Sequence, residues 1–192
     1  MNRVDKLEKA VRAIYETRNP DRDEWADWLY ESHVFAVARE AKKLSAEYGV
    51  ENDLPIAAAI LHDIADAEMS RFDPRHDKRS IEIAREMLAD NGFSSEEQKI
   101  VENALRNHGC RDGRKPAFIE GKIMATADAV VHISTDYYEH VAEFKRREGT
   151  SEADIASWAL SKIERDYQWK ICFDKIRERE KMNYERVKSL FR

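Results

Sequence analysis

The sequence has little cysteine, glycine or proline, and it has no long apolar run. Its two cysteines, Cys110 and Cys172, lie far apart and form no Cys-x-x-Cys pair, so neither a disulfide framework nor a zinc ribbon is indicated. No stretch of about 18 uncharged apolar residues occurs, and no apolar segment follows the charged start of the chain. We therefore expect a soluble, unprocessed protein in the cytoplasm, with no membrane partner.

Charged residues and helix formers are abundant instead. Charged side chains make up 37% of the 192 residues, beside only 6 Gly and 4 Pro, and this composition predicts an all-α fold with charged outer faces. The length fits a single domain over residues 1–192. We expect its core at about 25–135, with C-terminal helices at about 136–192 packing on it. The net charge of -5 gives no strong nucleic-acid signal.

Apolar periodicity and cap residues predict where the helices lie. Ser94 and Glu97 form a capping-box pattern, and Gly49 is placed to end a helix in a left-handed conformation. From Ile155 to Ile176 the apolar spacing predicts one long, kinked helix. Before it, helices are expected over about 3–17, 24–49, 53–66, 77–90, 95–108 and 118–133.

The segment 57–66 poses a problem of buried charge. It is rich in Ala, Ile and Leu on every side, so it predicts a buried helix whose last turn carries His62, Asp63 and Asp66. A buried unpaired charge costs several kcal/mol, roughly, so these side chains need a partner. Either a metal cation or a salt-bridged pair would meet that need.

Three further ionisable residues fall within apolar stripes of other predicted helices. His33 lies between Leu29 and Val37, and His108 and Asp128 are placed similarly. Any one of them alone is typical of a satisfied core residue. Buried ionisable groups that converge from several helices are how helical folds build metal sites, so the set predicts one.

The order of these residues, a His, then a His-Asp pair, then an Asp on successive helices, resembles the HD superfamily of metal-dependent phosphohydrolases. The resemblance covers about residues 25–135 and includes the residues around the pair, 58–64, and around the last acid, 122–129. It implies an HD-domain helical bundle with a long C-terminal helical extension. The metal ligands that it implies are His33, His62, Asp63 and Asp128.

The resemblance also implies a mechanism and a cofactor. A divalent metal (Mn, Fe, Co, Ni, Mg or Zn) would activate a water for attack on phosphorus, and Asp66 would handle the proton. His76 and His108 match the order of two extra histidines in two-metal members, so either could bind a second metal or the substrate. Because His76 follows His62 by only 14 residues and is expected in a loop, we expect one ion, with two as the alternative.

Basic residues are needed to bind the phosphate of a small phosphorylated substrate, and the candidates are Arg114, Lys115 and Lys122, each of which could instead be solvated surface charge. The C-terminal apolar stripe could pack on its own domain or on a second copy in a homodimer. Two other functions stay open. These are a di-iron HD-type oxygenase acting on a small organic substrate and a non-catalytic ligand-sensing protein.

Overall fold

The computed structural model describes residues 2–17 and 19–192, except for the side chain of residue 112, and this part of the chain holds helices and no β-strand. The all-α prediction is confirmed. None of the described helices is both long and apolar enough to cross a membrane. The α-helices are α1 (Arg3–Glu16), α2 (Ala26–Trp28), α3 (Phe35–Glu47), α4 (Leu54–Leu61), α5 (His76–Asp90), α6 (Ser95–Asn107), α7 (Ile119–Ser134), α8 (Tyr137–Arg147), α9 (Glu152–Arg165), α10 (Asp174–Arg179) and α11 (Lys181–Ser189).

Local signals in the sequence set several of these boundaries. The Ser94 hydroxyl accepts a hydrogen bond from the Glu97 backbone N–H at 3.3 Å, and the Glu97 carboxylate accepts one from the Ser94 N–H at 2.7 Å. This is the predicted capping box, and it opens α6. Gly49 has φ 66°, so the left-handed end after α3 is also confirmed.

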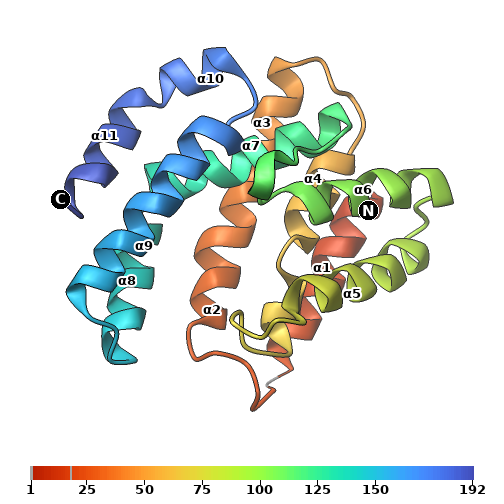
Figure 1. Cartoon of the computed structure of the whole chain (residues 1–192). Helices are drawn as coiled ribbons and strands as arrows, with labels where there is room; N and C mark the ends of the chain where they lie inside the picture. The colour runs from red at the N-terminus through yellow and green to blue at the C-terminus, as the bar shows by residue number, and fades with distance from the viewer. Residues whose placement is uncertain (1, 18) are drawn as a thin grey trace.

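Helix α7 lies at the centre of the fold. Its residues from Ile123 to Ile133 are all buried, because the segment is apolar on every side. It packs against α3, α4 and α6, and Figure 1 shows α3 and α7 between α1, α4, α5 and α6 on one side and α8 to α11 on the other. A polar side chain on α7 is therefore held inside the protein, where it needs a partner.

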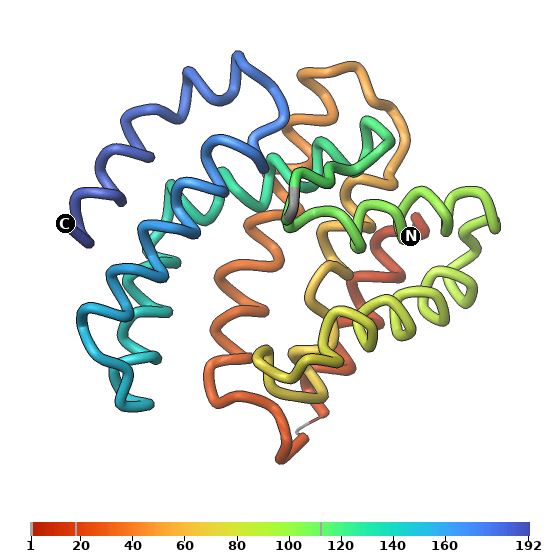
Figure 2. Tube along the Cα trace, viewed as in Figure 1, coloured from red at the N-terminus to blue at the C-terminus, as the bar shows by residue number. Residues whose placement is uncertain are grey.

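The C-terminal segment does not form the single long helix that the sequence predicts. After α9 comes a π-helical segment, Asp166–Lys170, and then an extended stretch before α10. The stretch is held against α7, because the Cys172 N–H donates to Thr126 Oγ1 at 3.0 Å. Figure 2 shows that the chain reverses here, so that α11 runs back alongside α9, which it contacts.

The buried helix of the His-Asp pair is also shorter than predicted. Helix α4 ends at Leu61, His62 caps it, and Asp63 has φ -126° and ψ 31°, outside helical geometry. A 3-10 turn, Ile64–Ala67, follows. The prediction that the three ionisable residues share the last turn of one helix is therefore wrong, and the turn of the chain gives each of them its own direction.

Candidate metal centre

His33 enters the site from a π-helical segment, Leu29–Val34, that lies between α2 and α3. A π-helical turn inserts one residue into the helical register and often marks a functional site, because it redirects a side chain. The His33 ring is 1% exposed and is stacked on His132 of α7, with ring centroids 4.7 Å apart. The sequence prediction that His33 faces the core is confirmed.

His62 lies at the end of α4 in a fixed tautomer. Its Nδ1 is 2.7 Å from the Ala59 carbonyl oxygen, and since a carbonyl can only accept, this nitrogen carries the proton. In the neutral form of the ring the lone pair is therefore at Nε2, which is 3.3 Å from Nε2 of His33. Two imidazole nitrogens that face each other so closely need a proton or a metal cation between them.

Asp128 of α7 brings a carboxylate to the same point. Its Oδ1 lies 3.2 Å from His33 Nε2, 3.9 Å from His62 Nε2 and 3.2 Å from Nε2 of His132, one turn later on α7. Despite these neighbours, Asp128 Oδ1 is buried and has no hydrogen-bond partner among the described atoms. A buried oxygen without a donor, surrounded by imidazole nitrogens, is what a bound divalent cation would satisfy.

A metal fits the residues that are present. Ligand atoms of His33, His62 and Asp128 all lie within 4.8 Å of one another, and all three residues are buried. Two imidazoles and a carboxylate form a donor set typical of Mn, Fe, Co, Ni and Zn. Asp63 lies at the edge of this group, with Oδ2 3.1 Å from His62 Nε2. Its place as a fourth ligand stays a prediction.

Arg71 links Asp63 to Asp66. One guanidinium nitrogen donates to Asp63 Oδ2 at 2.5 Å and also to Asp66, while Arg71 Nε donates to Asp66 Oδ1 at 3.2 Å. His76 Nε2 is 2.8 Å from the same Asp66 oxygen. Asp66 is 1% exposed and has two cationic partners, so these contacts give it a part in positioning Arg71. Its predicted role in proton transfer stays a prediction.

His76 differs from its predicted position in a loop. It is the first residue of α5 and is buried, because the polar stretch before it folds inward to place Arg71 and His76 on Asp66. Burial lowers the pKa of His76, but hydrogen bonds to Asp66 and Asp77 and the nearby Asp63 charge together outweigh this and raise the pKa to about 10. The ring is therefore cationic near pH 7 in the metal-free protein. Its role in binding a second metal or the substrate stays a prediction.

A second buried cluster supports the site from the C-terminal segment. Asp166 is 0% exposed and accepts hydrogen bonds from His132 Nδ1 at 2.9 Å, from the Tyr138 hydroxyl at 2.6 Å and from Lys162 Nζ at 2.8 Å. Because the Nδ1 side of the His132 ring is held by Asp166, its Nε2 faces Asp128, 3.2 Å from Oδ1. The ammonium of Lys170, one turn after Asp166, donates to Asp128 Oδ2.

The electrostatics favour neutral rings at His33 and His132 and ionised carboxylates at Asp63 and Asp128. Burial lowers the pKa of His33 and lowers that of His132 further, because a charged imidazolium would lose its hydration. Burial also acts to raise the pKa of Asp63 and Asp128. For Asp63 the Arg71 guanidinium and the His62 ring together reverse this effect, and for Asp128 the His132 ring, the Lys170 ammonium and the His33 ring do so, and both pKa values lie well below the usual range.

His62 and His108 differ in protonation. Burial lowers the pKa of His62, but the adjacent Asp63 carboxylate outweighs this, and in the absence of a metal the net pKa is raised. His108 lies just after α6, with its Nδ1 2.8 Å from the Leu105 carbonyl and its ring 5.6 Å from that of His62. Burial and then Lys170 lower its pKa to about 4. The neutral His108 ring thus offers a lone pair to the cavity in front of the centre.

That cavity has a volume of about 210 Å³ and is bounded by Asp63, Asp128 and His108, among others. Three of its cationic wall residues, Arg71, Lys162 and Lys170, are residues that the sequence analysis did not single out. The predicted phosphate ligands lie further out. Arg114 and His108 share the wall of a smaller neighbouring cavity, Lys115 lies over the Trp169 ring, and Lys122 is in the first turn of α7. Their role in binding phosphate stays a prediction.

An all-helical protein in which histidines and an aspartate from separate helices converge on one buried point belongs to the class of helical proteins with a metal-binding centre. The sequence profile of the HD domain matches residues 30–133, which is more than half of the chain. The protein therefore belongs to the HD domain family, which implies binding of a divalent metal. Comparisons with curated proteins and with solved structures found no match.

The residues that the sequence analysis missed are those whose partners are distant along the chain. His132 carries a usable signal, since it follows Asp128 by four residues within an apolar run and so lies on the same face of α7. Asp166 and Lys170 are also four apart, and both interrupt an apolar stripe between Ile163 and Ile171. The stripe signals burial, but nothing in it identifies Asp128 as the partner.

Proposed function

We propose that the protein is a metal-dependent hydrolase of phosphate esters, in which His33, His62, Asp63 and Asp128 hold one divalent ion. The observation that carries the proposal is the unsatisfied Asp128 Oδ1, which three imidazole nitrogens surround in a buried site. When bound, the ion would supply a Lewis acid that polarises a phosphoryl oxygen and lowers the pKa of a water molecule.

The charge balance of the site supports an anionic substrate. Among the described residues, the buried carboxylates around the centre and the cationic side chains that contact them are equal in number. A divalent ion therefore adds two positive charges that a phosphate dianion would neutralise. The carboxylates are Asp63, Asp66, Asp128 and Asp166, and the cations are Arg71, His76, Lys162 and Lys170.

Arg71 and Lys170 are the residues that we assign to the phosphoryl oxygens. Both line the cavity, and both already contact a carboxylate of the centre, Asp63 for Arg71 and Asp128 for Lys170. A guanidinium donates five N–H groups in a planar fork and can bind a carboxylate and a phosphate together. Lys170 adds a positive charge from the opposite side of the centre.

Two residues could handle the proton of the attacking water. His108 is neutral and its Nε2 is free of the Leu105 hydrogen bond, so it can accept a hydrogen bond from water. Asp66 is an acid held by Arg71 and His76. Turnover that falls in His108→Ala and is unchanged in Asp66→Asn would assign proton handling to His108, and the opposite pattern would assign it to Asp66.

The experiment that tests the proposal is a metal-supplemented screen of the protein against a panel of phosphate esters, with elemental analysis of the same preparation. We expect metal-dependent release of phosphate from at least one ester. His62→Ala should abolish it, and the matched control His140→Ala should not, because His140 is stacked on Trp28 outside the centre. Two irons per chain with no phosphate release would instead support an oxygenase.

A further inference from the structure

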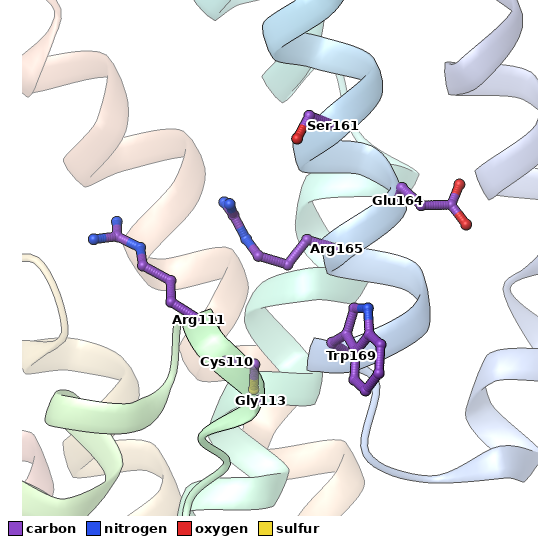
Figure 3. Close-up of a pocket in the computed structure, with 7 residues that line it drawn as sticks. All are labelled: Cys110, Arg111, Gly113, Ser161, Glu164, Arg165 and Trp169. Carbon is purple, nitrogen blue, oxygen red and sulfur yellow. The ribbon is translucent and has the colours of Figure 1, made fainter.

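A second cavity lies beside the one at the metal centre. Its volume is about 600 Å³, large enough for a small organic molecule, and it lies between the loop after α6 and the outer face of α9. Among the described wall residues of the two cavities, only Arg111 and Arg165 belong to both. The wall of the larger cavity consists of Cys110, Arg111, Gly113, Ser161, Glu164, Arg165 and Trp169 (Figure 3).

These two arginines stand where the cavities meet. Figure 3 shows the Arg165 side chain reaching from α9 toward the side on which Arg111 lies. A molecule that extends from the metal centre into the larger cavity would therefore lie beside residues that line both cavities. Trp169, with 52% of its surface exposed, offers that molecule an aromatic face further out.

Neither guanidinium has a strong carboxylate partner among the described residues. Arg165 Nε is buried and lacks a hydrogen-bond partner among the described atoms, while Arg111 lies 3.7 Å from a carboxylate oxygen of Asp77, whose side chain is 72% exposed. Glu164 lines the same cavity, but its Oε2 accepts hydrogen bonds from Tyr184 at 2.6 Å and Lys188 at 3.0 Å. Several other arginines make two hydrogen bonds to one carboxylate, as Arg85 does to Glu102.

We propose that Arg111 and Arg165 form a subsite for a second anionic group of the substrate. The preferred substrates are then phosphate esters whose leaving group carries a carboxylate or a further phosphate, because planar guanidinium groups bind either anion in bidentate fashion. The inference rests on the proposed function, which places the reacting phosphoryl group at the metal centre. The body of the leaving group occupies the larger cavity, against Trp169.

The test measures binding of phosphonates, which have a carbon–phosphorus bond in place of the ester, to the metal-loaded protein by calorimetry. Each ω-phosphonoalkanoate is compared with the alkylphosphonate of equal carbon number, over a series of chain lengths. At the length that spans both sites, the carboxylate should tighten binding about ten-fold or more, the value of one charged hydrogen-bond pair. We call the dissociation constant of the alkylphosphonate divided by that of the matching phosphonoalkanoate the carboxylate ratio. Arg111→Gln and Arg165→Gln should each bring this ratio close to one.

Two further variants make the result specific. Arg165→Lys keeps the cation and should retain a ratio above one, and Arg147→Gln removes an exposed arginine of α8 and should retain the full ratio. Melting temperatures of all variants show whether the fold is intact, and Arg165→Lys still reports on the subsite if the glutamine variant unfolds.

The failures of this inference and of the proposed function are distinguishable. A ratio of one at every chain length in the unmodified protein, or a full ratio that persists in both glutamine variants, overturns the subsite. If the subsite is overturned in this way but the protein hydrolyses phosphate esters, the proposed function stands without the subsite. If the ratio is found and no ester is hydrolysed with any metal, the subsite stands and the proposed function fails.

Discussion

At the scale of single residues, Asp166 connects several side chains of the site. It is 0% exposed, and one of its oxygens receives donors from His132, Tyr138 and Lys162. Burial raises the pKa of Asp166, but Lys162 and other cations outweigh this, and the pKa lies well below its usual value. Asp166 is thus the acceptor that fixes the orientation of His132 toward Asp128.

We predict that Asp166→Asn destabilises the fold by about 3 kcal/mol, because breaking a buried ion pair leaves a buried charge uncompensated. The affinity for a divalent metal should also fall, since His132 loses its orientation. Urea unfolding and metal titration measure the two effects. The matched control is Asp174→Asn, since that carboxylate is 94% exposed and, among the described residues, pairs with Arg177 alone. A loss no larger than that of the control would contradict the role of Asp166.

A second residue-scale prediction concerns pH. The pKa of His76 is raised from 6.5 to about 10 in the folded protein, so protonated His76 adds to stability fully below pH 6.5, and the contribution disappears as pH rises through 10. The free energy of unfolding of His76→Gln should therefore fall furthest below the unmodified protein near pH 6 and approach it near pH 10. A difference in the free energy of unfolding between the two proteins that stays constant between these pH values would mean that His76 is neutral.

At the scale of elements, the spacing between α6 and α7 positions Asp128. Gly121 of α7 faces α6, and a Cβ there would lie 2.6 Å from the Cβ of Pro116 and 3.1 Å from that of Ala104. The absence of a side chain at this position lets the two helices approach closely, so that the face of α7 with Asp128 reaches the histidines.

We therefore predict that Gly121→Ala costs about 1–2 kcal/mol of stability, because overpacking outweighs the gain in helix propensity. Gly109→Ala is the control, since a Cβ at that position meets only the flexible Arg111 side chain, at 3.5 Å or more. Chemical denaturation of both variants measures the difference. An unchanged or higher stability of Gly121→Ala would show that α6 and α7 can move apart without a loss of folding free energy.

The same elements show what the sequence can and cannot predict. Caps are local, so the box at Ser94 and the left-handed Gly49 follow directly from the residues. The end of α4 at Leu61 was missed, since the apolar run continues through Ile64 and Ala65 and gives no signal for a turn. Tertiary contacts of Asp63 and Asp66 with Arg71 set that turn.

The candidate site divides in the same way. The convergence of His33, His62 and Asp128 was predicted, because each lies in an apolar stripe and their order resembles a known pattern. The contact of Lys170 with Asp128 joins residues 42 apart, across a break in the helix that periodicity cannot foresee. Periodicity in the sequence therefore does not predict ion pairs between distant segments, and only the structure shows them.

At the scale of the whole molecule, the C-terminal helices complete the centre. The family match covers residues 30–133, yet the cations on the far side of the cavity, Lys162 and Lys170, come from beyond it. The C-terminal segment is thus part of the site, and it also forms one wall of the larger cavity. Packing of these helices on a second copy of the chain stays a prediction.

The measurement that tests the account most directly is phosphate release by metal-free protein to which a divalent metal is added in steps, with the best ester of the screen as substrate. We predict no phosphate release without metal, a linear rise in release with added ion, and a plateau at one equivalent per chain. The His62→Ala variant should release no phosphate at any metal concentration. Release that is independent of added metal, or no release at any metal concentration, would contradict the account.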